Sequence, residues 1–110
     1  MSASIFGNPT AEKILLYMES FGEGYAAAIA ETYAFPSVSM VQRQLERLER
    51  SGLLVSALKG RTRLFTWNPR YPFLTELRAL LRKEIQYLPQ DERRRYFAKR
   101  RRPRRTGKPL

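Results

Sequence analysis

The segment Val41–Val55, VQRQLERLERSGLLV, constrains the fold more than any other part of the chain. Val41, Leu45 and Leu48 recur at spacings of three and four, which predicts one apolar face of an amphipathic helix. Gly52 then fits the left-handed position at which many helices end. A coiled coil would need this pattern to continue for about three or four heptads, and it does not. The segment therefore predicts a charged helix that ends at a glycine and leads directly into an apolar strand.

The residues before this segment predict two further helices. Asn8-Pro9 is typical of a helix start, and a first helix is expected from about residue 10 to residue 20. Gly22 and Gly24 interrupt it, and a short alanine-rich helix is expected at about 25–32. Pro36 disfavours helical geometry at the residue before it, so a turn separates this helix from the charged one. Ser37 or Ser39 can cap the charged helix.

The residues after Gly52 predict a hairpin and a long helix. Residues 53–58 are apolar except for Ser56, and residues 63–67 alternate, so each segment is expected to form a strand. The turn between them, 59–62, is basic. An amphipathic helix is expected at about 73–88, and a further helix at about 90–102. The predicted fold class is therefore α+β and mainly α, with three N-terminal helices, a β-hairpin and a long C-terminal helix.

Positive charge is concentrated at the C-terminal end. The sequence has 21 basic and 10 acidic residues, and 10 of the basic but only 2 of the acidic ones lie in residues 90–110. We expect a folded domain at 1–88 and an arginine-rich tail at 89–110 that is partly helical or disordered. A net charge of +11 indicates a polyanionic partner. A solubilising tail is the alternative, but acidic residues serve solubility better than arginines do.

The sequence contains no cysteine and no histidine. Disulfides and thiolate catalysis are thereby excluded, and the commonest general base and metal ligand are missing. Neither a Ser/His/Asp set nor a phosphate-binding glycine loop is present, so we expect no enzyme, no cofactor and no metal. No apolar run approaches the roughly 20 residues of a membrane span, and the first residues lack the features of a secretion signal. We therefore expect a cytoplasmic protein without a membrane partner.

The segment from Ile29 to Asn68 resembles the winged helix-turn-helix of the ArsR-like bacterial and archaeal regulators. Those proteins show a small residue in the second helix, a recognition helix of the type S-x-V-S-x-x-L-x-x-L-E-x-x-G-L-[LV], and a wing that ends in an aromatic strand. The matching residues here are Ala30, Ser39, Val41, Leu45, Leu48, Glu49, Gly52, Leu53 and Leu54. The resemblance covers about residues 10–88 and implies a winged helix-turn-helix fold. Metal sensing is not implied, because the metal-sensing members use cysteines and histidines.

The resemblance also implies which residues bind double-stranded DNA. The recognition helix of such a motif lies in the major groove, where arginine suits guanine, glutamine suits adenine, and apolar groups contact the thymine methyl. The wing tip suits phosphates or the minor groove. A solvated helix face and a charged hairpin that discourages edge pairing are the alternatives. The predicted DNA-binding residues are Ser37, Ser39, Met40, Gln42, Arg43 and Arg47 in the helix and Lys59, Arg61, Thr62 and Arg63 in the hairpin. The tail is not part of the family pattern, and its residues Arg93, Arg94, Arg100 and Arg101 are predicted to contact phosphates because of the tail's positive charge.

The resemblance further implies a homodimer formed through the first and last helices. The apolar residues that would form its interface are Ile14, Leu15, Met18, Leu74, Leu77, Leu81, Ile85 and Leu88. The same stripe could instead be core. We expect a sequence-specific regulator of transcription, with repression by promoter occlusion as the simplest mechanism. Two other classes stay open: an architectural or RNA-binding protein dominated by its tail, and a subunit of a toxin–antitoxin or mobile-element complex that binds a second protein.

Overall fold

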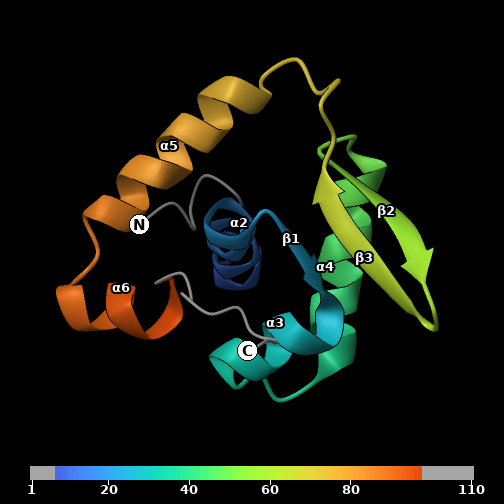
Figure 1. Cartoon of the computed structure of the whole chain (residues 1–110), viewed down its shortest axis with the longest axis horizontal. Coiled ribbons are helices and arrows are strands. Elements are labelled where there is room, and N and C mark those ends of the chain that lie inside the picture. Colours follow the sequence, from blue (N-terminus) through green and yellow to red (C-terminus); the bar gives the residue numbers. More distant parts are fainter. Residues whose placement is uncertain (1–6, 98–110) are drawn as a thin grey trace, which may run out of the picture.

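The computed structural model describes residues 7–97, which form five helices and one three-stranded sheet. Their order is α2 (Pro9–Phe21), β1 (Glu23–Tyr25), α3 (Ala26–Tyr33), α4 (Val38–Arg50), β2 (Leu54–Lys59), β3 (Thr62–Trp67), α5 (Leu74–Gln86) and α6 (Gln90–Tyr96). Helix α2 lies at the centre, with α4 and the sheet to one side and α5 and α6 to the other (Figure 1). The expected fold class, mainly helical with a β-hairpin wing, is confirmed.

Local sequence signals account for the ends of α2 and α4. Asn8 Oδ1 accepts a hydrogen bond from the backbone of Ala11 at 2.6 Å, and Pro9 occupies the first turn of α2. Ser37 caps α4 by accepting a hydrogen bond from the backbone of Ser39 at 3.1 Å. Gly52 has φ 90°, the left-handed conformation that was predicted for the residue after the helix.

Strand β1 was not predicted. Residues Glu23–Tyr25 pair antiparallel with β3, which gives the sheet order β1-β3-β2. Glycine is required at position 24, because a Cβ there would lie 2.9 Å from the ring of Tyr17 and 3.0 Å from Ile29 Cδ1. A strand of three residues is too short to show an alternating pattern, so its formation depends on pairing with β3.

A single hydrophobic core joins the helices of the described region, and α6 contacts it through Tyr96. The fully buried large side chains are Ile14, Leu15 and Met18 of α2, Ile29 of α3, Val41 and Leu45 of α4, Leu54 and Phe65 of the hairpin, and Leu81 of α5. Phe97, which is 8% exposed, packs in the same core. Two residues of the expected tail at 89–110, Tyr96 and Phe97, therefore pack against the folded body, and residues 98–110 lie outside the described part of the chain.

Half of the residues predicted for the dimer interface are buried in this core instead. Ile14, Leu15, Met18 and Leu81 are 0% exposed within a single chain, so they stabilise the fold and present no surface to a second copy. The other four predicted residues, Leu74, Leu77, Ile85 and Leu88, are half-buried against the same core. Spacing alone could not separate the two possibilities, because an apolar stripe on a helix is equally compatible with either.

Helix α5 also carries an apolar flank that the core does not cover. Phe73, Leu80 and Tyr87 repeat every seven residues and are 63%, 43% and 68% exposed. The opposite flank is polar, with Thr75 and Gln86 exposed. Arg78 holds α5 against α2, because its Nε donates to Glu19 Oε1 at 2.8 Å, and Arg82 Nε lies 3.5 Å from Glu19 Oε2.

Candidate nucleic-acid interface

Besides its buried stripe, helix α4 has three other faces: an outer face, a face that adjoins α2 and a face that adjoins the wing. Val41, Leu45 and Leu48 are buried in the core. Helical geometry places Ser39, Arg43 and Arg50 opposite that stripe, and all three are exposed. Among the described residues Arg43 has no hydrogen-bond or ion-pair partner. Its guanidinium is therefore available to an external ligand, which fits the predicted role in base reading.

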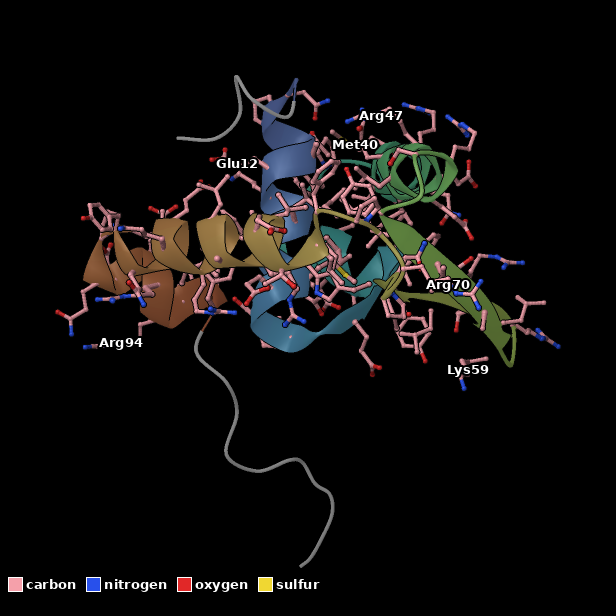
Figure 2. All side chains as sticks on the ribbon, turned by 90° about the horizontal axis from the view of Figure 1, so that it is seen from above. Glu12, Met40, Arg47, Lys59, Arg70 and Arg94 are labelled. Carbon is pink, nitrogen blue, oxygen red and sulfur yellow. The ribbon has the colours of Figure 1, made fainter. Side chains whose placement is uncertain are left out.

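The face of α4 that adjoins α2 is partly occupied by contacts within the chain. Met40 is half-buried against the core, so its predicted contact with a base is restricted. Arg47 Nε donates to Gln44 Oε1 at 3.0 Å, and Asn8 Nδ2 of the α2 cap lies 3.5 Å from the same oxygen. Figure 2 shows Met40 and Arg47 on the same side of α4. Arg47 is exposed and remains suited to a phosphate.

The face of α4 that adjoins the wing includes Gln42. Its amide Nε2 donates to Glu46 Oε2 at 3.0 Å, as the solvated-face alternative expected. The amide must leave that carboxylate before it can pair with a base. Ser37 and Ser39 are likewise engaged with each other, their hydroxyl oxygens 2.6 Å apart, while Ser37 caps the helix. Unlike Gln42, Ser37 and Ser39, Arg43 could contact a base without first breaking a hydrogen bond to another described residue.

The wing is a tight hairpin with cations at its tip. Lys59 pairs with Thr62, so the loop consists of Gly60 and Arg61 alone, and Thr62 Oγ1 donates to the carbonyl of Lys59 at 3.1 Å. Lys59, Arg61 and Arg63 are all exposed. Arg63 is oriented by a relay: its Nη1 donates to Ser56 Oγ at 3.1 Å, and that hydroxyl donates to Glu49 Oε2 of α4 at 2.8 Å.

A groove of about 340 Å³ separates α4 from the wing. It brings together four of the predicted residues, Gln42 from the helix and Arg61, Thr62 and Arg63 from the wing. It also includes residues that the sequence analysis missed, among them Tyr25, Val38 and Leu58. Val38 and Leu58 are 47% and 63% exposed. Because these apolar side chains are exposed beside cations in the groove, they are candidates for contact with a ligand bound there. Their apolar character in sequence suggested burial, so no pattern distinguished them.

The predicted arginines of α6 do not adjoin this groove. Arg94 is exposed and Arg93 half-buried, and Arg94 and the wing residue Lys59 lie at opposite ends of the molecule (Figure 2). The structure therefore separates the predicted DNA-binding residues into two groups. Arg100 and Arg101 lie outside the described residues.

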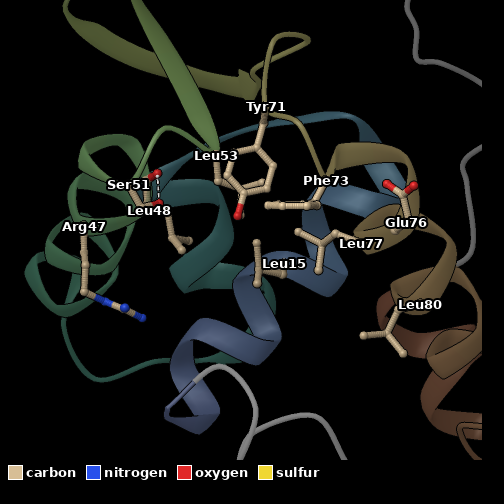
Figure 3. Close-up of a pocket in the computed structure, with 10 residues that line it drawn as sticks. All are labelled: Leu15, Arg47, Leu48, Ser51, Leu53, Tyr71, Phe73, Glu76, Leu77 and Leu80. Atoms are coloured by element: carbon tan, nitrogen blue, oxygen red, sulfur yellow. Dashed lines mark hydrogen bonds between the residues drawn. The ribbon is translucent and has the colours of Figure 1, made fainter.

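A second hollow, of about 460 Å³, lies between the C-terminal end of α4 and the start of α5 (Figure 3). Leu48, Leu53, Tyr71, Phe73, Leu77 and Leu80 give it an apolar lining, with Arg47 and Glu76 at its edge. It is continuous with the exposed flank of α5 through Phe73 and Leu80. Its composition is suited to an apolar contact rather than to a polyanion.

Within residues 7–97, no cluster of three or more acidic, histidine or cysteine side chains could hold a metal ion. None of the helices in that part of the chain is long and apolar enough to cross a membrane.

No protein-family model matches the chain, and no curated protein matches it in sequence. Solved structures do match its fold. YusO from Bacillus subtilis superposes with a TM-score of 0.58 and 21% identity over 83% of this chain and 70% of that one. BpsR from Bordetella bronchiseptica, whose DNA binding is regulated by 6-hydroxynicotinic acid, gives 0.55 and 20% over 83% and 76%. A mutant of ZitR from Lactococcus lactis gives 0.53 and 18% over 78% and 73%. ZitR is a zinc-responsive member of the MarR family. The chain shares the winged-helix fold of these proteins.

Proposed function

We propose that this protein is a sequence-specific double-stranded DNA-binding regulator of transcription that acts as a homodimer, most simply as a repressor. The observation that carries the proposal is the groove between α4 and the wing, where Gln42 faces Arg61 and Arg63, with Arg43 beside it on the outer face of α4. A recognition helix in the major groove and a wing on the adjacent backbone would use these two elements together. The matched structures support this reading through their fold.

Within this class, the pattern of the recognition helix favours an ArsR-like protein, whereas one of the matched structures belongs to the MarR family. The ArsR-like assignment therefore depends on the matching sequence residues between Ala30 and Leu54, most of which lie in α4. Cytoplasmic location follows from the proposed function, since such a regulator acts where the DNA is.

The exposed flank of α5 is the surface we propose for the dimer. Phe73, Leu80 and Tyr87 form an apolar strip along one side of the helix, and the hollow lined by Leu48 and Tyr71 continues it. A two-fold contact through this strip would bury apolar side chains that single soluble chains seldom leave exposed together. It would also set two recognition helices a fixed distance apart, as a two-fold symmetric operator requires.

The two rival classes use the same surfaces differently. In an architectural or RNA-binding protein, the cations would supply all the affinity for nucleic acid, and Arg43 would not distinguish one base from another. In a toxin–antitoxin or mobile-element subunit, the flank of α5 would bind a different protein. Arg43, which has no partner within residues 7–97, lies on the outer face of α4 and favours sequence reading over the first of these.

Fluorescence anisotropy tests the proposal, with the DNA upstream of the protein's own gene and a scrambled duplex compared across a salt series. A regulator binds the upstream DNA more tightly, and the preference persists at physiological salt. Arg61→Ala should weaken both duplexes and lower the salt slope by about one. Lys83→Ala, which removes an exposed cation from α5, is the control for lost charge. Equal affinity for both duplexes at every salt concentration would refute the proposal.

A further inference from the structure

The first residue of α4 is an apolar side chain that the core leaves partly uncovered. Val38 is 47% exposed, whereas Val41 and Leu45, which continue the apolar stripe of the helix, are 0% exposed. Ala26 and Ala27, at the start of α3, line the groove beside Val38, and side chains of this size do little to cover it. The apolar stripe of α4 therefore reaches the surface at the end where the helix begins.

This exposed valine lies in the groove that carries the proposed function. Val38 and Gln42 are four residues apart, so helical geometry places them on one face of α4, about 6 Å apart along its axis. That face lines the groove, and Arg61 and Arg63 of the wing line the other side. The tip of the wing lies toward the end at which α4 begins (Figure 1). A ligand that contacts Gln42 and the wing cations together would therefore also meet Val38.

We propose that Val38 determines part of the base preference, by contact of its methyl groups with the 5-methyl group of a thymine in the major groove. The inference rests on the proposed function and assigns one base of the preferred DNA. The N-terminal residues of a recognition helix are those that contact base edges, and Val38 is the first residue of α4. An apolar side chain gains nothing from phosphates. Among the groups that base pairs present in the major groove, the thymine methyl is the apolar one.

Two other apolar side chains, Met40 and Leu58, are less suited to this contact. Met40 was predicted from sequence to bind DNA, but it is half-buried against the core. Leu58 is 63% exposed, but it belongs to the wing, where it pairs with Arg63 across the hairpin. A wing suits phosphates or the minor groove, whereas the thymine methyl is presented in the major groove. Val38 is therefore the residue that combines exposure with a position at the start of α4.

Uracil substitution tests the contact, because uracil lacks the 5-methyl group of thymine and keeps its hydrogen-bonding groups. Each thymine of the upstream duplex is replaced in turn, and fluorescence anisotropy measures the Kd of the full chain for each duplex. At one thymine, and at its equivalent in a symmetric site, uracil should raise Kd by about two- to fourfold, as expected for one buried methyl group. Val38→Ala should bind the thymine and uracil duplexes of that position equally. A loss of stability in the variant would weaken both duplexes alike, so it cannot produce this convergence.

Leu58→Ala is the matched control, because it removes an exposed apolar side chain from the other side of the same groove. It should leave the cost of uracil unchanged. Three results would overturn the inference: no uracil substitution weakens binding of the unmodified chain, the cost of uracil persists in Val38→Ala, or that cost disappears in Leu58→Ala. Equal affinity for the upstream and scrambled duplexes would reject the proposed function and this inference together. A preference for the upstream DNA that is insensitive to uracil would reject this inference alone.

Discussion

Ser56 in β2 donates its hydroxyl to Glu49 of α4 at 2.8 Å, and this bond joins the wing to the last turn of that helix. The same hydroxyl accepts a hydrogen bond from Arg63, so a single side chain orients both a wing cation and the strand beneath it. The separation of α4 and the wing is therefore partly determined by Ser56. Groups that must contact one duplex at two places gain affinity when their spacing is fixed before binding.

Ser56→Ala should weaken binding of the upstream DNA without removing any group that contacts it. We expect a loss of about 0.5–1 kcal/mol in binding, which is about two- to fivefold in Kd. Ser51→Ala is the matched control. This substitution removes a comparable hydrogen bond, which the Ser51 hydroxyl donates to the carbonyl of Leu48 at 2.8 Å. The bond lies at the same end of α4 but away from the wing. Anisotropy measures both variants. Equal effects of the two substitutions would show that Ser56 acts only through stability.

Arg43→Ala should change base preference as well as affinity. Because this guanidinium is exposed and unpaired among the described residues, its loss costs the folded protein little. At the preferred DNA the expected cost is about 1–3 kcal/mol, with relaxed discrimination at one base pair. Binding to a library of single-base operator variants measures this. If affinity falls equally for every variant in the library, Arg43 contacts phosphate and reads no base.

The capping residues of α4 and the spacing of its apolar residues made that helix predictable from sequence. The basic turn before Thr62 made the wing predictable. Their opposition across one groove could not be derived from pattern and came from the family resemblance. Strand β1 was missed because three residues carry no periodicity. The position of α6 was missed because it depends on a contact between Tyr96 and Tyr33, 63 residues apart in sequence.

Helix α5 shows why apolar residues alone did not locate the dimer surface. Leu81 and Leu80 are adjacent in sequence, yet one is 0% and the other 43% exposed. Which of them faces α2 depends on the rotation of the helix about its axis, and the contact of Arg78 with Glu19 is consistent with the rotation observed. Sequence identifies both leucines as apolar, but only the packed structure separates core from surface.

Leu80→Glu should dissociate the proposed homodimer and leave the monomer folded. The side chain is 43% exposed in the single chain, so a carboxylate there remains hydrated in the monomer but would be buried in the dimer. Light scattering after size exclusion should show the mass of one chain instead of two. Gln86→Glu adds the same charge on the polar flank and should leave the dimer intact. If the unmodified chain is already monomeric, the α5 flank serves a different partner.

Glu19→Gln should destabilise the fold through the α2–α5 contact. The Glu19 side chain is 6% exposed, while those of Arg78 and Arg82 are 37% and 60% exposed, so water screens part of the attraction. After this discount we expect a loss of about 1–2 kcal/mol in the free energy of unfolding. Urea denaturation measures it. Glu76→Gln, at an exposed position of α5, is the control, with an expected change below about 0.5 kcal/mol. A change at Glu19 no larger than at Glu76 would mean that the pair contributes nothing.

Tyr33 should make stability decline in alkali. Burial raises the pKa of the Tyr33 phenol above its usual value of 10.0, and the neighbouring Glu92 and Glu12 raise it further. The folded state therefore holds this proton more tightly than the unfolded state. Its contribution is complete below about pH 10 and is lost as the pH rises above that value, because the unfolded chain ionises first, with a slope of at most about 1.4 kcal/mol per pH unit.

Unfolding by urea at pH 8 and at pH 11, for the unmodified chain and for Tyr33→Phe, isolates this effect. Phenylalanine keeps the contacts with Tyr96 and Phe35 but loses the hydrogen bond to the carbonyl of Lys13 and cannot ionise. The unmodified chain should therefore be the more stable at pH 8, and its advantage should shrink or reverse at pH 11. Burial also raises the pKa of Tyr17, which is present in both proteins, and its repulsion of an ionised Tyr33 is part of the difference that is measured. An advantage of equal size at both values of pH would mean that the Tyr33 phenol titrates alike in the folded and unfolded chains.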